Sequence, residues 1–416
     1  MSLSCFDLSE HTLSVAEAMQ ALHALVPHSV DIERLPLAAL GNRVLAEDAR
    51  SPIDVPQNTN AAMDGVALAW QAARTRYAVV GEALAGHRHV GALDEGEAVT
   101  ITTGAPLPEG ADTVVMREQL ILDRTQGKLF VDVQNAESVR HGQNIRQAGE
   151  DIARGALALR AGTRLRAPHL GLLASLGQAE AAVYRRPRVA IFSTGDEVHA
   201  PGGPLPSDGI YDANRFSLLG MLEALGCEVL DLGILADDPA CLRTALHAAA
   251  ERADMVITSG GVSVGQADWV KQALQETGRL GAWRIAMRPG RPLAFGTLGM
   301  REVPFFGLPG NPVAAMVSFL QFVQPLLRCL QGETDWQPQR LTAIAEERMR
   351  SREGRVDYHR GAYGSNDEGQ LLVRTTGAQG SGRLTSMVAA NCLIEIEAAR
   401  GEVAPGETVI IQPFGG

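Results

Sequence analysis

Residues 186–330 alternate short apolar runs with longer amphipathic segments, and this rhythm restricts the fold more than any other feature. We predict strands at 188–192, 227–232 and 255–258 and helices at 212–225, 239–252 and 267–277. Alternation of this kind produces a parallel sheet with helices on both faces. Ligands of such sheets bind at the carboxyl ends of the strands, so the loops after Phe192, Thr258 and Leu308 form the predicted site.

The first helix of this region has clear end signals. Asp212 fits an N-cap and Gly226 fits the residue just after the helix. Its apolar spacing predicts a buried stripe of Phe216, Leu219, Leu222 and Leu225.

The second of these loops is a glycine-rich turn between a strand and a helix. Gly260, Gly261 and Gly265 can adopt backbone angles closed to other residues, and the N–H groups that open the next helix point toward any phosphate held there. Two hydroxyls and a carboxylate accompany the glycines, from Ser259, Ser263 and Asp268. Asp268 could hold a divalent cation beside the anion. Taken alone, a turn that merely packs a strand on a helix also explains the glycines.

The other two loops carry polar groups as well. Ser193 and Thr194 offer hydroxyls to a phosphate or ribose, and Asp196 and Glu197 offer carboxylates to a metal or a sugar hydroxyl, although helix capping also accounts for this motif. The third loop is Pro309, Gly310 and Asn311, where prolines on either side enforce a rigid backbone before the helix predicted at 313–330.

Three arginines follow at 284, 288 and 291. If residues 284–288 form a strand, Arg284 and Arg288 share one face, and Arg291 lies at the turn that follows. Guanidinium groups bind phosphate and tetrahedral oxyanions in a bidentate manner, so we favour an anion site over a solvated charged face. Asp64 precedes a glycine, and an Asp-Gly turn explains it when it is considered alone.

Composition narrows the class of protein. The 416 residues suffice for three or four domains, and a net charge of −11 argues against a general nucleic-acid binder. The five cysteines form no C-x-x-C pair, which argues against disulfides and a cysteine zinc site. Without a signal peptide or an 18-residue apolar run, we expect a cytoplasmic protein that does not enter a membrane.

The remaining segments predict further domains. Ser14 caps a helix predicted to reach about His28, which we interpret as an interaction helix. Residues 51–145 read as a β-rich domain, and 1–50 with 146–184 as one discontinuous mixed domain. After the α/β domain at 185–330, residues 331–416 predict a C-terminal β-barrel or sandwich, with strands near 340–345, 356–363, 371–376, 392–396 and 408–412.

Several common enzyme classes do not fit. Gly260 and Gly265 have the outer spacing of a P-loop, but Gln266 and Ala267 occupy the positions that require Lys and Ser or Thr. The first strand of the α/β domain is not followed by G-x-G-x-x-G, and H-E-x-x-H is missing from the sequence. A kinase-like NTPase, a dinucleotide dehydrogenase and a zinc hydrolase are therefore disfavoured.

Taken together, the motifs resemble the molybdopterin molybdenumtransferase family, which includes the gephyrin E domain. They occur in the family's order across nearly the whole chain, as Met63-Asp64-Gly65, Thr103-Gly104-Ala105-Pro106, Gly149-Glu150-Asp151, Ser193-Thr194-Gly195-Asp196-Glu197, Ser259 to Gly265, Pro289-Gly290-Arg291-Pro292, Leu308-Pro309-Gly310-Asn311-Pro312, Gly380-Ser381-Gly382 and Ser386-Met387.

The resemblance implies an elongated four-domain homodimer whose cleft joins the molybdopterin-binding domain of one subunit to the β-rich domain of the other. It also implies that adenylylated molybdopterin and molybdate are converted to molybdenum cofactor with release of AMP. A divalent cation, expected to be Mg²⁺, would be needed, and the molybdopterin adenylyltransferase is a candidate partner.

The resemblance assigns roles to particular residues. Asp64, Glu197 and Asp268 are expected to be catalytic, and Glu197 and Asp268 to hold the metal. The expected substrate-binding residues are Thr103, Ser193, Thr194, Asp196, Ser259, Gly260, Gly261, Ser263, Gly265, Arg284, Arg288, Arg291, Pro309, Gly310, Asn311 and Ser381.

The sequence departs from the family at two points. Arg284, Arg288 and Arg291 stand where the family commonly has lysines, which keeps the charge but changes its geometry and hydration. Val66 replaces the aromatic residue usual after Met-Asp-Gly.

Three other functions compete with the transferase. The adenylyltransferase shares a similar Ser-Gly-Gly turn but has a single domain, so the additional domains count against it. A non-catalytic scaffold would not need three carboxylates around an anion pocket. A paralogue that uses tungstate cannot be distinguished by sequence, because tungstate and molybdate share charge and shape.

Overall fold

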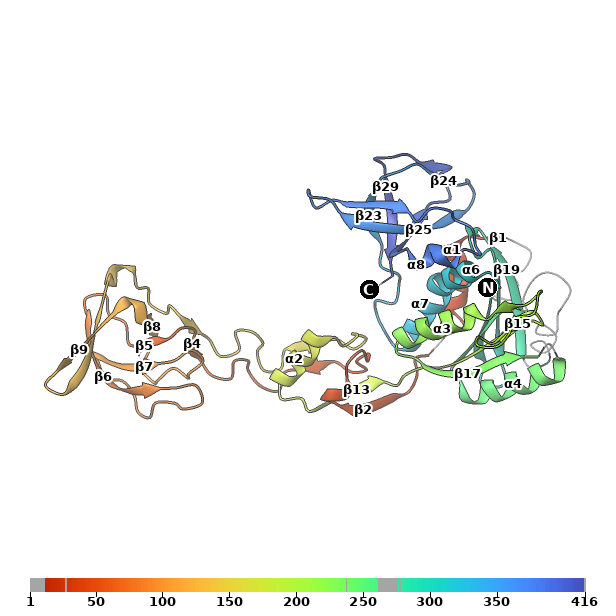
Figure 1. Ribbon diagram of the computed structural model, residues 1–416. Coiled ribbons are helices and arrows are strands. Elements are labelled where there is room, and N and C mark those ends of the chain that lie inside the picture. Colours follow the sequence, from red (N-terminus) through yellow and green to blue (C-terminus); the bar gives the residue numbers. More distant parts are fainter. Residues whose placement is uncertain (1–11, 27, 237, 261–275, 277, 415–416) are drawn as a thin grey trace, which may run out of the picture.

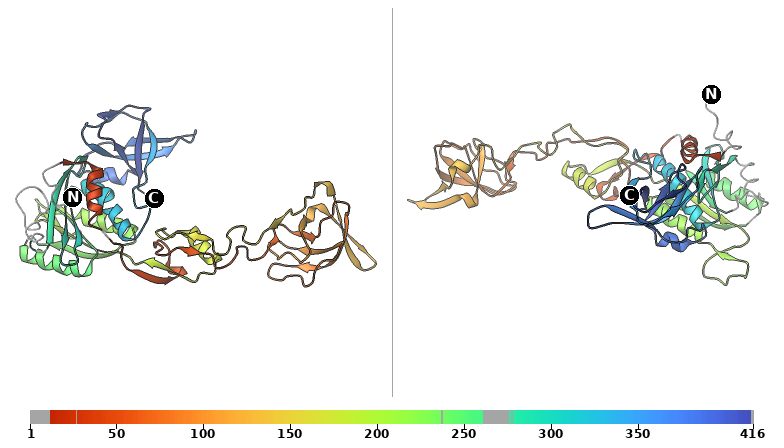
Figure 2. Two further views of the ribbon diagram at one scale, coloured as in Figure 1. Left: turned by 180° about the vertical axis from the view of Figure 1, so that it is seen from behind. Right: turned by 90° about the horizontal axis from the view of Figure 1, so that it is seen from above.

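The computed structural model describes residues 12–26, 28–236, 238–260, 276 and 278–414. The molecule is elongated. The β-rich domain lies at one end, a narrow middle segment follows, and the α/β and C-terminal domains lie together at the other end in all views (Figures 1 and 2).

The α/β domain is built on a seven-stranded sheet in the order β1-β19-β21-β22-β18-β14-β17. Neighbours among β17, β14, β18 and β22 are parallel, as predicted, whereas β21 runs antiparallel to both β22 and β19. The sheet is therefore mixed and not wholly parallel. The strands are β1 (Thr12–Leu13), β14 (Arg188–Thr194), β17 (Glu228–Leu235), β18 (Met255–Ser259), β19 (Gly278–Ile285), β21 (Pro292–Leu298) and β22 (Val303–Leu308).

Two apolar layers sandwich this sheet, because successive side chains of a strand point to opposite faces. In β14, Val189 and Ile191 join one core with Leu218 and Leu222, while Ala190 and Phe192 join another with Leu242 and Leu246. Helices α3 and α4 therefore lie on opposite faces, as predicted, whereas the helix predicted at 267–277 lies outside the described residues except for residue 276. The helices of the described chain are α1 (Val15–His23), α2 (Ala167–Ser175), α3 (Ala213–Ala224), α4 (Pro239–Arg252), α6 (Pro312–Ser318), α7 (Gln324–Leu330) and α8 (Leu384–Val388).

Helix α3 confirms its predicted ends and most of its predicted buried stripe, and Phe216 is the exception. Asp212 is the N-cap, accepting the Arg215 N–H, and Gly226 has φ +75° just after the helix. Phe216 is 48% exposed, whereas Leu222 is buried and Leu219 and Leu225 pack half-buried against the same core. Arg215 and Leu218 are buried as well. An ion pair of Arg215 with Asp212 makes it favourable to bury Arg215, which a purely apolar pattern could not predict.

The N-terminal helix is not an open interaction surface. Ser14 caps α1 in a capping box with Glu17, and Ala18 and Leu22 are buried in the core of the α/β domain. Strand β1 also pairs with β19. Residues 12–26 therefore pack on the α/β domain, whereas the predicted domain division places them with 146–184.

The middle segment consists of short two-stranded ladders where the chain runs out and returns. Strand β2 pairs with β13, β3 with β12 and β4 with β11, and a small core includes Leu40 and Leu165. The strands are β2 (Ile32–Pro36), β3 (Ala49–Arg50), β4 (Asn60–Ala61), β11 (Ile145–Arg146), β12 (Leu157–Leu159) and β13 (Glu180–Tyr184).

The β-rich domain is a six-stranded sheet in the order β8-β5-β7-β6-β10-β9. Alternating side chains of β5 enter two cores, with Ala67 in one and Val66 and Leu68 in the other. The strands are β5 (Gly65–Leu68), β6 (Arg76–Ala83), β7 (Glu97–Ile101), β8 (Thr113–Met116), β9 (Leu120–Thr125) and β10 (Lys128–Val133).

The C-terminal strands form a six-stranded sheet in the order β20-β25-β26-β23-β29-β27, which an additional β25–β27 pairing closes like a barrel. All five strands predicted after residue 331 are confirmed. The strands are β20 (Met287–Arg288), β23 (Leu341–Ala345), β25 (Val356–Ser365), β26 (Leu371–Thr375), β27 (Cys392–Ile396) and β29 (Thr408–Pro413). Two further short pairs are β24 (Met349–Arg350) with β28 (Glu402–Val403) and β15 (Val198–His199) with β16 (Ile210–Tyr211).

One continuous helix runs from α6 through a π-helical turn at Phe319–Val323 into α7. Its length and composition, over Pro312–Leu330, would suffice for a membrane span. However, 72% of its apolar window is buried inside the protein, as in a core helix.

Candidate functional site

The three predicted loops meet because three neighbouring parallel strands end in register. Ser193 of β14 lies opposite Ser259 of β18, and Ser259 lies opposite Leu308 of β22. The motifs that begin at these residues therefore emerge side by side at the carboxyl edge of the sheet, as the sequence predicts.

Gly260, the first glycine of the glycine-rich turn, is required by the backbone atoms that surround it. Gly260 has φ +90°, and a Cβ atom there would lie 2.9 Å from the carbonyl oxygen of Thr194. Its N–H donates to the carbonyl oxygen of Leu308 at 3.3 Å. Gly260 thus crosses closely between the ends of β14 and β22, where a side chain would not fit.

Asn214, which the sequence analysis did not select, joins two of the loops. Its side-chain N–H₂ donates to Ser259 Oγ at 2.6 Å and to the carbonyl oxygen of Gly310 at 2.7 Å. Asn214 lies in the first turn of α3, directly after the Asp212 cap. The sequence signal that could have identified Asn214 is its position two residues after a predicted N-cap, near a strand-end loop.

The hydroxyl of Ser193 is buried and hydrogen-bonded to another residue of the protein. The side chain is 2% exposed, and its hydroxyl donates to Asp212 Oδ1 at 2.9 Å. Thr194 is also buried, at 1% exposed. The side chain of Ser193 therefore supports the turn and the helix cap, and its predicted contact with a ligand remains a prediction.

The acidic part of the site is open to a ligand. Asp196 and Glu197 are both exposed in the loop after β14. The Glu197 carboxylate curls back over the turn, because a Cβ atom on Gly195 would lie 2.8 Å and 3.0 Å from its two oxygens. Asp268, Gly261, Ser263 and Gly265 lie outside the described residues.

The donor chemistry fits Mg²⁺. Within the described chain, three or more Asp, Glu, His or Cys side chains do not gather as one metal site. Mg²⁺ typically binds through one or two carboxylates together with waters and substrate phosphates, so Glu197 beside a glycine-rich turn suits it.

Arg284 and Arg288 share one face, as predicted, but residues 284–288 do not form one continuous strand. Arg284 and Arg288 are exposed, whereas Ile285 and Met287 between them are buried. The chain leaves the central sheet after Ile285, and Met287 and Arg288 pair with Val356 and Asp357 of β25. Arg288 therefore lies at the junction with the C-terminal domain, and Arg291 is exposed just beyond it.

This junction places a buried arginine, Arg360, near the exposed Arg288. Arg360 of β25 is 1% exposed and donates to Ser386 Oγ at 3.1 Å and to the carbonyl oxygen of Gly380 at 3.2 Å. Burial, reinforced by the charge of Arg288, lowers the pKa of Arg360 to about 10. Sequence reasoning missed Arg360 because a charged residue in an apolar strand gives no sign of which loop it faces.

His359 belongs to the same cluster. It is 7% exposed, and burial lowers its pKa to about 4, assisted by Arg360 and Arg288 and opposed by Asp357. A neutral imidazole is therefore held beside the arginines at neutral pH.

Ser381 contacts the start of the helix that follows the third loop, which is the loop after β22. Its carbonyl oxygen accepts the N–H of Val313, in the first turn of α6. Gly310 and Asn311 are exposed just before that helix, and Pro309 is half-buried. The loop after β22 and the segment around Ser381 thus line one junction between the α/β and C-terminal domains.

Asp64 lies on a different domain. Its Oδ1 accepts the N–H of Thr103 at 2.7 Å and the Thr103 hydroxyl at 2.8 Å. These hydrogen bonds lower the pKa of Asp64, the backbone one most. Within one chain, β5, which begins directly after Asp64, lies at the opposite end of the molecule from β15, which begins directly after Glu197 (Figure 1). Asp64 therefore does not meet Glu197 of the same chain.

Similarity to known proteins agrees with this arrangement of domains. The chain matches the MoeA N-terminal region, domains I and II, over residues 13–177, a probable molybdopterin binding domain over 190–329, and the MoeA C-terminal region, domain IV, over 342–414.

Relatives of known function extend over almost the full length. The chain is 44% identical over 405 residues to the molybdopterin molybdenumtransferase of Haemophilus influenzae, covering 97% of this chain and 98% of the relative. It is 34% identical to that of a Nostoc species, covering 96% and 93%. A crystal structure of the molybdopterin biosynthesis MoeA protein from Pyrococcus horikoshii superposes with a TM-score of 0.80 at 28% identity, covering 97% and 100%. The chain belongs to the molybdopterin molybdenumtransferase family.

Proposed function

We propose that this protein inserts molybdenum into adenylylated molybdopterin and releases AMP, in a reaction that depends on a divalent cation, Mg²⁺. The observation that carries the proposal is the shared register of Ser193, Ser259 and Leu308, which gathers three polar loops at one sheet edge. Membership in the molybdopterin molybdenumtransferase family supports the substrate class.

The phosphates of the substrate would lie against the Gly260 turn. The N–H groups of such a turn suit phosphate oxygens, and Asn214 fixes the turn relative to Gly310. Hydrolysis of the anhydride adds the oxygen of water to one phosphorus, and the other phosphate leaves with the bridging oxygen. Mg²⁺, held by Glu197 and Asp268, would offset the negative charge of these phosphates.

Molybdate would bind toward the arginines. It is a tetrahedral dianion, and Arg284, Arg288 and Arg291 supply exposed positive charge at the carboxyl end of β19 and in the segment that follows it. Arg360 lies deeper at the same junction, hydrogen-bonded to Ser386. We infer that this cluster stabilises the oxyanion before and during its transfer.

The active protein would be a homodimer. Asp64 and Thr103 are hydrogen-bonded to each other on the remote β-rich domain and so could complete only a site on another copy. A separate adenylyltransferase would supply the adenylylated substrate, and we propose that this protein associates with it. We expect the reaction to occur in the cytoplasm, without nucleic acid or membrane.

The test is a direct assay. The protein is incubated with adenylylated molybdopterin, Mg²⁺ and either molybdate or tungstate, and AMP release is measured. Release with molybdate supports the proposal, whereas release only with tungstate would assign the protein to tungsten chemistry. If neither oxyanion produces AMP, the transferase function is wrong.

A further inference from the structure

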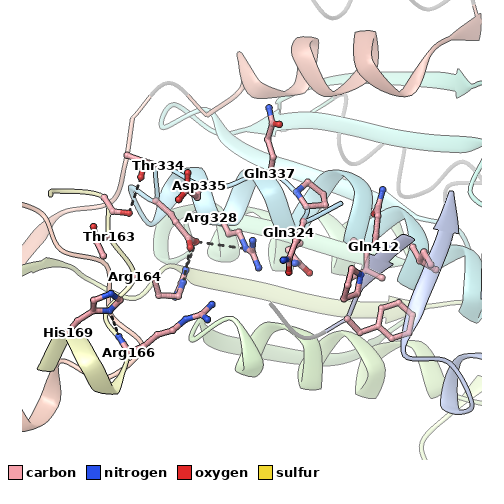
Figure 3. A pocket seen from close by; sticks show the side chains of 18 residues that line it. Thr163, Arg164, Arg166, His169, Gln324, Arg328, Thr334, Asp335, Gln337 and Gln412 are labelled. Atoms are coloured by element: carbon pink, nitrogen blue, oxygen red, sulfur yellow. Dashed lines mark hydrogen bonds and ion pairs between the residues drawn. The ribbon is translucent and has the colours of Figure 1, made fainter. Parts of the chain in front are cut away.

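A cleft of about 510 Å³ lies where the middle segment, helix α7 and the C-terminal sheet meet (Figure 3). It shares no lining residue with the strand-end site predicted above. Its volume is within the range of pockets that bind small molecules.

One end of the cleft carries three arginines. Arg164 contacts Glu333 through Nε at 3.2 Å and Nη2 at 2.8 Å, and the same carboxylate lies 3.9 Å from Nε of Arg328. Burial lowers the pKa of Arg328, and the positive charges of Arg164 and Arg166 lower it further against the opposing effect of Glu333. Even with exposed Asp335 in the lining, three guanidiniums face two carboxylates, so this end stays positive.

Arg166 is the arginine best placed to receive a ligand. It is exposed and makes no ion pair with another side chain of the described residues. Its backbone N–H donates to His169 Nδ1 at 2.9 Å. Because that nitrogen accepts, the neutral imidazole carries its proton on Nε2 and adds a donor beside Arg166.

The other end of the cleft has the shape and chemistry to hold a planar heterocycle. Phe414, which is 37% exposed, and buried Leu393 provide apolar surface. The exposed amide of Gln337 and the half-buried amide of Gln324 lie along the wall, whereas Gln412 is fixed by Gln321 and Glu395. In Figure 3 the cationic residues lie on one side of the cleft, Gln412 lies on the other, and Gln324 lies between them.

We propose that this cleft binds a small organic phosphate, with the phosphate at Arg166 and Arg328 and a planar heterocycle between Phe414 and Gln324. Guanidinium groups bind phosphate oxygens in a bidentate manner, and amides beside an aromatic ring match the edge and face of a heterocycle. The inference goes beyond the proposed transferase reaction, since it concerns a second site.

The test uses a local probe, because AMP is also expected at the strand-end site. Trp336 lies between the lining residues Asp335 and Gln337, and its ring is 5.2 Å from that of His23. The full-length protein is labelled with 5-fluorotryptophan, and the ¹⁹F resonance of Trp336, assigned with Trp336→Phe, is followed during titration with AMP, adenosine and inorganic phosphate. AMP should shift it at lower concentration than either fragment.

Substitutions assign the response to the cleft. Arg166→Ala should weaken AMP binding about ten- to a hundredfold, the loss expected for one charge-assisted contact, and Arg166→Lys should weaken it less. Arg166 is chosen because Arg164 also anchors Glu333 and its loss could disturb the fold. Arg160→Ala is the matched control, because Arg160 is exposed on the same segment but does not line the cleft.

Three outcomes would overturn the proposal. They are a Trp336 resonance that AMP does not move, a response that Arg166→Ala leaves unchanged, and a response that Ser259→Ala at the strand-end site abolishes. An equal response to inorganic phosphate and AMP would show that the cleft binds free phosphate, and it would refute the proposed binding of a planar heterocycle.

Discussion

Glu197 is the residue of the described chain on which the proposed cation site depends most, since its carboxylate curls over the turn after β14. We predict that Glu197→Gln and Asp268→Asn each abolish metal-dependent AMP release without unfolding the protein. Glu197 is exposed, so the core should not be disturbed. AMP release against Mg²⁺ concentration and circular dichroism give the two readouts. Near wild-type turnover at saturating Mg²⁺ in either variant would refute its role as a ligand.

Arg288 pairs with Asp357 of the C-terminal sheet, at the junction of the two domains. Removing it should raise the molybdate requirement or weaken pterin binding about ten- to a hundredfold, at roughly 1.5 to 3 kcal/mol per charge-assisted hydrogen bond. Arg288→Lys should be milder, because the charge remains and only the bidentate geometry is lost. AMP release is measured during molybdate titration at fixed substrate. If Arg284→Ala and Arg288→Ala both leave molybdate dependence and pterin affinity unchanged, the oxyanion binds elsewhere.

His359 makes a prediction about pH. Its pKa of about 4 in the folded protein is below the ordinary value of 6.5, so the folded state disfavours protonation. Its contribution to stability is complete above pH 6.5 and is lost as pH falls toward 4. The free energy of unfolding should fall by up to about 2 kcal/mol between pH 7 and 5 from this residue. Urea unfolding at both pH values measures this, and His359→Gln should reduce the difference. An unchanged difference would show that His359 is not responsible.

At the scale of elements, the strand-end loops depend on one backbone conformation. Gly260→Ala should lower the free energy of unfolding by about 1 to 3 kcal/mol, because φ +90° is unfavourable for alanine and its Cβ would meet the Thr194 carbonyl. Gly310→Ala is the matched control for stability, since its Cβ would have no atom within 4 Å. Chemical denaturation compares the two variants. Equal stability of both would mean that the turn is not constrained.

The helices and strands also show where local pattern suffices. Asp212, Gly226 and the alternation of β14 could be predicted, because caps and side-chain periodicity are properties of neighbouring residues. The break after Ile285 could not, because Met287 and Arg288 pair with Val356 and Asp357, which lie far away in the sequence.

At the scale of the whole molecule, the separation between the β-rich and α/β domains leads to a test of a shared site. Asp64→Asn alone should depress turnover while leaving nucleotide binding nearly intact, because Asp64 lies on the remote domain. Mixing Asp64→Asn chains with Asp268→Asn chains should restore part of the activity, because each heterodimer carries one site with both carboxylates intact. Activity is measured after subunit exchange has been confirmed. Absence of any recovery would refute a site built from two subunits.

The sequence by itself determined the fold class, the order of the motifs and the polar residues of the strand-end loops, since these depend on residue type and local spacing. Only the tertiary structure decided that Asn214 links Ser259 to Gly310, that Arg360 lies near Arg288, and that a basic cleft forms around Arg166. Each of these depends on the approach of segments far apart in the chain. Strand register and domain packing set that approach, and no local pattern of residues encodes it.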